Sequence, residues 1–127
     1  MKRSMLFRLA LVGVTALALQ RANAASAVVT DGHGHLTTSA GQLTEELAKY
    51  DALTTARQKF GANVRLLASS GRSGYGAIAV ARRANGHGSI VGIALGRGSQ
   101  SEADRLAMEQ CLKGGGVWPE VRWRIRG

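Results

Sequence analysis

The start of the chain limits how much of it is left to fold. Three basic residues lie within the first eight positions, followed by an uncharged apolar run over residues 9–19 and an Ala-x-Ala motif at 22–24. This pattern is typical of a secretory signal peptide. As a helix the run would reach about 16 Å, against a roughly 30 Å hydrocarbon core, so a membrane span is the weaker interpretation. Arg21 is an unusual charge so near the cleavage site, and an uncleaved amphipathic anchor is therefore the alternative. We predict a signal peptide at 1–24 and an exported protein, periplasmic or secreted, whose mature chain has no transmembrane segment.

Cleavage would leave 103 residues, enough for one domain with a modest core and too few for two. It would also remove four basic residues and no acid, lowering the formal net charge from +9 to +5. The remaining charge is uneven, because residues 25–64 carry three bases and four acids whereas residues 65–127 carry ten bases and four acids. This asymmetry favours an anionic partner for the second half. Cys111 is the only cysteine, so no disulfide can form within the chain, and we expect a buried thiol.

The patterning of the mature chain predicts an α+β domain. Residues 25–42 are rich in Gly, Ser and Thr and are expected to form a flexible N-terminal arm, with a single domain over 43–127. The expected elements are a helix ending at Gly61, strands at 63–69, 75–81 and 89–95, a helix at 99–113 and a strand from Val121. The second and third strands should pair as a hairpin across Asn85-Gly86. We expect a small antiparallel sheet of about four strands with both helices packed on one face.

The two expected helices differ in their apolar residues but share one spacing. Large side chains recur every three or four positions from Leu43 to Phe60 and predict the buried face of the first helix. Both helices also carry small residues four positions apart: Ala52 and Ala56 in the first, Ala103, Ala107 and Cys111 in the second. Such residues let a helix lie close on a sheet, which explains the spacing, and a duplicated unit is the alternative explanation.

The C-terminal strand carries the strongest functional signal. Val121, Trp123 and Ile125 alternate with Arg122, Arg124 and Arg126, which predicts an apolar face and a face lined by three guanidinium groups. Such a row could bind repeating phosphates or carboxylates, although arginines also keep an edge strand from pairing with other chains. Trp123 is expected in the core. The candidate anion-contacting residues are Arg82, Arg83, Arg122, Arg124 and Arg126.

No motif predicts catalysis. The stretch "GRGSQSEA" at 96–103 lacks the third glycine of a dinucleotide fingerprint and the lysine of a phosphate loop, so we expect a helix cap by Ser99 with Glu102 or by Ser101 with Asp104. The histidines at 33, 35 and 87 lie in glycine-rich loops, which do not preorganise a metal site. We therefore assign no catalytic, cofactor-binding or metal-binding residue, expect no cofactor, and expect that the protein is not an enzyme.

Residues 74–111 resemble exported bacterial proteins grouped as domain of unknown function 4189. The resemblance rests on the Gly76 to Ala79 strand, the turn at 86–88, the strand at 89–95, the Ser99 to Ala103 segment and Cys111. It implies an exported small α+β domain and brings no activity or cofactor. The chain lacks the second cysteine and the closing Cys-Ala strand of that family, so the resemblance implies no disulfide here.

These observations favour a binding module that contacts an anionic envelope polymer or an acidic protein through its basic C-terminal strand. Two alternatives belong to other classes. One is an inhibitor or immunity-type protein of an envelope toxin, because a small basic domain suits an acidic cleft. The other is a small metal-dependent hydrolase that uses His33, His35 and His87.

Overall fold

The computed structural model describes residues 24–126, and the predicted signal peptide lies outside the described residues except for Ala24. The elements follow the order β1 (Ala25–Thr30), β2 (Leu36–Gln42), α2 (Glu45–Phe60), β3 (Arg65–Ser70), β4 (Tyr75–Arg83), β5 (Ser89–Arg97), α3 (Gln100–Lys113) and β6 (Gly116–Arg126). The predicted α+β class with two helices is confirmed, and so is the antiparallel pairing of β4 with β5.

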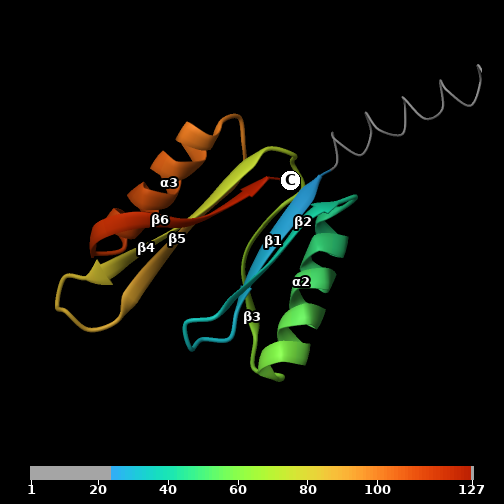
Figure 1. Cartoon of the computed structure of the whole chain (residues 1–127), viewed down its shortest axis with the longest axis horizontal. Coiled ribbons are helices and arrows are strands. Elements are labelled where there is room, and N and C mark those ends of the chain that lie inside the picture. Colours follow the sequence, from blue (N-terminus) through green and yellow to red (C-terminus); the bar gives the residue numbers. More distant parts are fainter. Residues whose placement is uncertain (1–23, 127) are drawn as a thin grey trace, which may run out of the picture.

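The strands form two sheets rather than one. Each sheet is antiparallel and three-stranded, with the orders β2-β1-β3 and β5-β4-β6. The expected single sheet of about four strands, with both helices on one face, is therefore wrong. Figure 1 shows α2 and α3 on opposite outer sides of the molecule with both sheets between them. Each sheet thus has one face covered by a helix and the other turned towards the second sheet.

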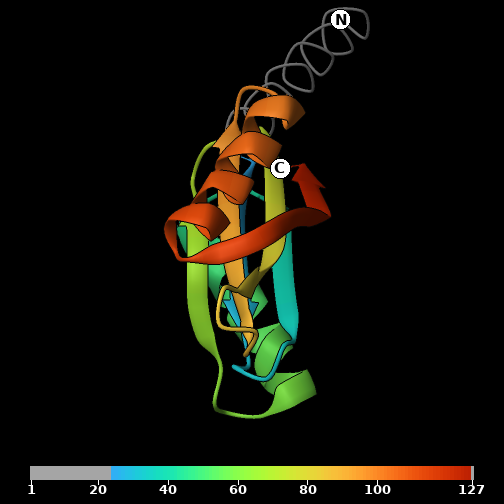
Figure 2. The ribbon, with the colours of Figure 1, turned by 90° about the vertical axis from the view of Figure 1, so that its left-hand side faces the viewer.

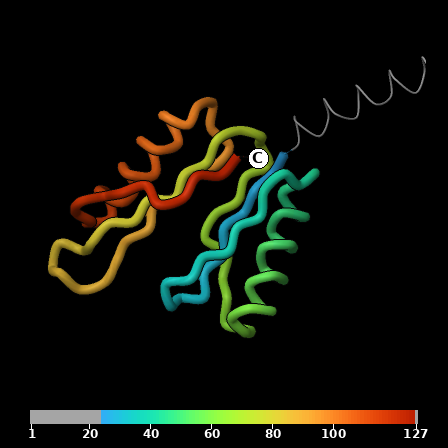
Figure 3. The backbone as a smooth tube through the Cα atoms, viewed as in Figure 1, coloured from blue at the N-terminus to red at the C-terminus, as the bar shows by residue number. Residues whose placement is uncertain are grey.

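The two halves of the chain repeat one topology. Each half runs strand, strand, helix, strand, and places its first strand in the centre of its sheet. Figure 3 follows the chain from the first half into the second through the short link at residues 71–74. In both helices the capping hydroxyl residue lies four positions before the first buried alanine, Thr44 before Ala48 and Ser99 before Ala103. The alternative explanation for the spacing of small residues in the helices is a duplicated unit, and the matching topology of the two halves agrees with it.

The predicted N-terminal arm is a pair of strands. Every residue of β1 is buried, and the antiparallel partner β2 buries Thr37 and Ser39. Ala25, Ala27 and Val29 face α2, whereas Val28 faces the other sheet, so both faces of β1 are covered. The side chains of β1 that face α2 are small, and this lets the helix pack close to the central strand.

Small residues also decide which face of α2 is buried. Ala48, Ala52 and Ala56 are fully buried on the sheet, whereas Leu47 and Tyr50 are 46% and 69% exposed. Of the large residues expected on the buried face, Leu53 packs against this alanine cluster, whereas Leu47 and Tyr50 lie at the flank of the helix. Short side chains bring the helix backbone near the strands, and the large ones do not fit in that narrow space.

The space between the two sheets forms a separate core. Its buried members come from three strands: Val28 of β1, Ile78 of β4 and Ile125 of β6. Leu36, Leu67, Ile93 and Leu95 pack around them from β2, β3 and β5. This interlayer core holds the two halves together, and it ends where the sheets leave a cleft.

Candidate functional site

A large cleft lies between the two sheets. It has a volume of about 710 Å³ and lies at the end of the molecule that carries the β1–β2 and β4–β5 loops, which Figure 1 shows at the same end. Gly32 and Gly34 of the first loop line one side, and Ser89 and Val91 of β5 line the other. Leu67, which packs against the interlayer core, also lines the cleft.

Three arginines converge on this cleft. Arg65 comes from the start of β3, Arg83 from the end of β4 and Arg122 from β6. No Asp or Glu lines the cleft, and none of the ion pairs within residues 24–126 includes any of the three arginines. The cleft therefore presents positive charge and guanidinium donors without an internal acceptor, which suits an anion.

Sequence reasoning found two of these three arginines. Arg83 and Arg122 were predicted, and Arg65 was not. The sequence feature that could have identified Arg65 is its position two residues before Leu67, because residues two apart in a strand share a face and both line the cleft. Which face of β3 lines the cleft becomes clear only from its pairing with β1, which places Arg65 opposite Thr30, next to the β1–β2 loop.

The predicted row of three arginines on one face is wrong. Arg122 is an extra residue in β6, because Ile78 pairs with Trp123 while the next residue of β4, Ala79, pairs with Val121. Such a bulge breaks the alternation of side chains and bends the strand, and Figure 2 shows that β6, in red, changes direction before its end. Arg122 therefore lines the cleft, whereas Arg124 and Arg126 lie on the face of the sheet that carries α3.

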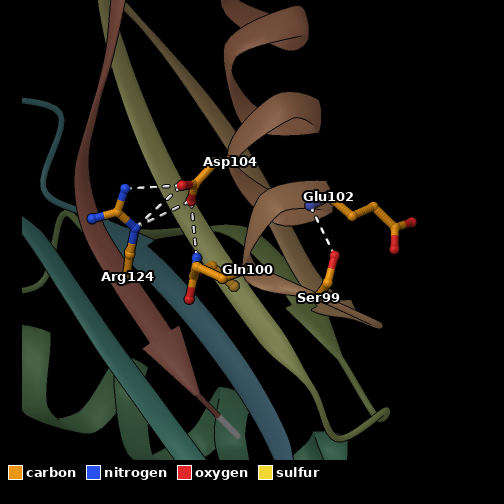
Figure 4. A network of polar contacts seen from close by, with 6 residues as sticks. Ser99, Gln100, Glu102, Asp104 and Arg124 are labelled. Atoms are coloured by element: carbon orange, nitrogen blue, oxygen red, sulfur yellow. Dashed lines mark hydrogen bonds and ion pairs between the residues drawn. The ribbon is translucent and has the colours of Figure 1, made fainter.

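Arg124 and Arg126 have partners within the fold. The Arg124 guanidinium donates to the Asp104 carboxylate of α3, with Nη2 at 2.9 Å from Oδ2 and Nε at 3.2 Å from the same atom (Figure 4). These hydrogen bonds lower the pKa of Asp104, although burial opposes them, and the same pair raises the pKa of Arg124. The Arg126 guanidinium lies 4.8 Å from the centre of the Tyr75 ring. Arg124 thus connects β6 to α3, and Arg126 connects it to β4.

The "GRGSQSEA" stretch is a helix cap, as predicted. Ser99 Oγ accepts a hydrogen bond from the backbone N–H of Glu102 at 3.1 Å, which Figure 4 shows. The Glu102 carboxylate in turn accepts from the backbone N–H of Gly98 at 3.3 Å. These contacts occupy the first turn of α3 and place a carboxylate there, where an anion would otherwise bind.

The histidines do not gather into a metal site. Among residues 24–126, no three His, Cys, Asp or Glu side chains form a group that could hold a metal ion. His35 Nδ1 lies 2.6 Å from Asp31 Oδ2, and the His35 ring stacks on Phe60 at 4.6 Å between centres. Asp31 also accepts from the backbone N–H groups of His33 and His35. His35 and Asp31 thus fix the β1–β2 loop that lines the cleft.

The Asp31 carboxyl is expected to titrate at low pH. Burial acts to raise its pKa, but the hydrogen bonds from His33 and His35 outweigh burial and lower the pKa from 3.8 to about 2. Because the folded-state pKa is depressed, the resulting stabilisation is present above pH 3.8 and is lost as the pH falls towards 2. A carbon-detected NMR titration should give a midpoint near 2 for Asp31 and a higher one in His35→Ala. An unchanged midpoint in that variant would contradict the role of the histidine.

Both tryptophans of β6 are accessible. Trp118 is 84% exposed, and Trp123, expected in the core, is 47% exposed and lines the cleft. Of the three predicted apolar residues only Ile125 is buried, and Val121, which the bulge separates from the other two, packs partly buried against the core under α3. Exposed indoles beside guanidinium groups are frequent at binding surfaces.

Cys111 is a buried packing residue. Its thiol is 3.4 Å from the carbonyl oxygen of Ala79, to which it donates, and burial raises its pKa. An uncharged, inaccessible thiol has low nucleophilicity.

Within residues 24–126, neither helix has the length and apolar character that crossing a membrane requires. Comparison with family models, with curated proteins and with solved structures gave no match to this chain. The resemblance to domain of unknown function 4189 therefore stays a prediction.

Proposed function

We propose that this protein is an exported, non-enzymatic binding module whose inter-sheet cleft binds an anionic partner, of which an envelope polymer or an acidic protein are the expected kinds. The observation that carries the proposal is the convergence of Arg65, Arg83 and Arg122 on a cleft without any carboxylate. The binding surface is thus this cleft and not the whole basic face expected of β6.

The distribution of acidic side chains supports this proposal. Within residues 24–126, every Asp and Glu except Glu120 takes part in a side-chain hydrogen bond or an ion pair. These residues are Asp31, Glu45, Glu46, Asp51, Glu102, Asp104 and Glu109. The Glu45 and Asp51 carboxylates, for example, accept hydrogen bonds from Ser69 and Ser39 on the two outer strands of the first sheet. The cleft arginines are left for an external acceptor.

Replacing the three cleft arginines should weaken binding to polyanions. We expect the variant Arg65→Ser/Arg83→Ser/Arg122→Ser to elute from immobilised polygalacturonate and polyphosphate at lower salt than the parent. Each lost contact should make the slope of log affinity against log salt shallower, by about 0.7 to 0.9 on a polyanion charged as densely as a nucleic acid. The matched control Arg57→Ser/Lys59→Ser/Lys113→Ser removes the same charge from exposed positions of the two helices, and none of these residues takes part in the ion pairs within residues 24–126. Equal elution of the two variants would overturn the proposal.

A further inference from the structure

A second pocket adjoins the cleft and differs from it in chemistry. It has a volume of about 430 Å³ and shares Val80, Ser89 and Arg122 with the cleft. Its other lining residues include Arg82, Trp118 and Glu120. The pocket is therefore lined by residues that carry two guanidinium groups, a hydroxyl, a carboxylate and an indole.

Trp118 is held in this pocket at a conformational cost. Its φ is +57°, the only positive φ at a residue other than glycine within residues 24–126. Pro119 follows it, and a residue before proline disfavours helical backbone angles further. Trp118 and Pro119 together lie opposite Ala81 alone, so a second bulge in β6 displaces the indole outward. A strained residue with an 84% exposed aromatic side chain gains little from packing, which points to a use in binding.

Glu120 indicates which anion fits this pocket. Within residues 24–126, it is the acidic residue without a hydrogen bond or ion pair, although Arg82 and Arg122 line the same pocket. A free carboxylate accepts hydrogen bonds from hydroxyl groups and repels any anionic group set against it, so a ligand here needs hydroxyl donors on the Glu120 side and its acid on the arginine side. Guanidinium groups bind a ligand carboxylate in bidentate fashion, and an indole offers a flat apolar surface to the C–H face of a sugar ring.

We infer that the Trp118 pocket binds a uronic acid residue of an acidic glycan, with the indole against the sugar ring, Glu120 accepting from ring hydroxyls and the arginines binding its carboxylate. The inference rests on the proposed function and names its ligand class. Arg122 lines both the pocket and the cleft, so the glycan continues from Trp118 into the cleft past Trp123. Single-stranded DNA would also stack on tryptophan, but within a strand it has no ring hydroxyl groups to donate to Glu120.

The test measures binding of a hexamer of galacturonic acid to the full mature chain by calorimetry. We expect Trp118→Gly to weaken binding about tenfold, equivalent to about 1.4 kcal/mol, whereas the control Tyr50→Ala leaves it unchanged. Tyr50 is an exposed aromatic residue on α2, on the other side of the molecule. Glycine tolerates the positive φ, so Trp118→Gly should keep or raise the melting temperature, which separates lost binding from lost folding. In Trp123→Phe, the fluorescence of the remaining Trp118 should change as the hexamer is added.

Two comparison ligands make the outcomes distinguishable. The methyl-esterified hexamer keeps the rings without the charge and should bind weakly, and an oligothymidylate of matched length should bind independently of Trp118. If Trp118→Gly binds the hexamer as the parent does while the cleft triple variant does not, the inference is wrong and the proposed function stands. If oligothymidylate binds more tightly and loses affinity in Trp118→Gly, the ligand is a nucleic acid and the inference is also wrong. If the cleft triple variant binds every anion unchanged, the proposed function itself fails.

Discussion

Gly92→Ala is expected to destabilise the protein by about 3 kcal/mol or more, because β5 lies against the backbone of α3 at this residue. A Cβ atom at position 92 would overlap the carbonyl oxygen of Ala107 and would lie 3.1 Å from the backbone nitrogen of Cys111. Backbone atoms in the middle of a helix cannot move aside as a flexible side chain can. The helix would have to shift off its sheet, exposing the small residues that pack between them.

Thermal unfolding followed by circular dichroism measures this effect. About 1 kcal/mol shifts the midpoint of a domain of this size by roughly 4 to 8 °C, so Gly92→Ala should melt at least about 12 °C lower or fail to fold. The matched control is Gly71→Ala, where a Cβ atom would meet only Glu45 side-chain atoms at 3.7 and 3.8 Å. Equal midpoints for the two variants would contradict the close approach of α3 to β5.

Ile78→Ala is expected to cost about 2 to 5 kcal/mol, the range for truncating a fully buried large aliphatic residue. Ile78 is fully buried in the interlayer core, where Val28 from the other half is buried as well. The truncation would leave a cavity between two sheets that cannot close without moving both. Denaturant unfolding measures the loss, and Leu112→Ala, which truncates a 53% exposed residue of α3, should change stability by less than about 0.5 kcal/mol.

A double-mutant cycle tests whether the two halves share this core. If Val28 and Ile78 pack together across the sheets, Val28→Ala and Ile78→Ala should be non-additive by about 0.5 kcal/mol or more. Strict additivity would contradict a packing contact between Val28 and Ile78.

Local patterns in the sequence predicted those parts of the fold that depend on neighbouring residues. Helix α3, its Ser99 cap and the β4–β5 hairpin follow from residues within a few positions of one another. The position of β1 does not, because its small residues become a central strand only when α2 covers one face and the second sheet covers the other. The division of the strands into two sheets likewise depends on contacts between distant segments, which the periodicity of apolar residues does not reveal.

The site was predictable to a similar extent. Composition located the positive charge in the second half, and Arg83 and Arg122 line the cleft. Alternation alone could not show that Arg122 is an extra residue in β6, since a bulge is a property of the pairing with β4. Arg124 was likewise assigned to a free surface, whereas Asp104, which is twenty positions away in the chain, is its partner.

The interlayer core makes each half of the chain dependent on the other. A break within residues 71–74 would yield two fragments of matching topology, one carrying Val28 and Leu67 and the other carrying Ile78 and Ile125. Each fragment would expose an apolar sheet face that only its complement covers, and at about half the length of an already small domain each would be marginally stable alone. The two fragments are thus suited to reassembly, in the way that split reporter proteins regain their structure when their pieces meet.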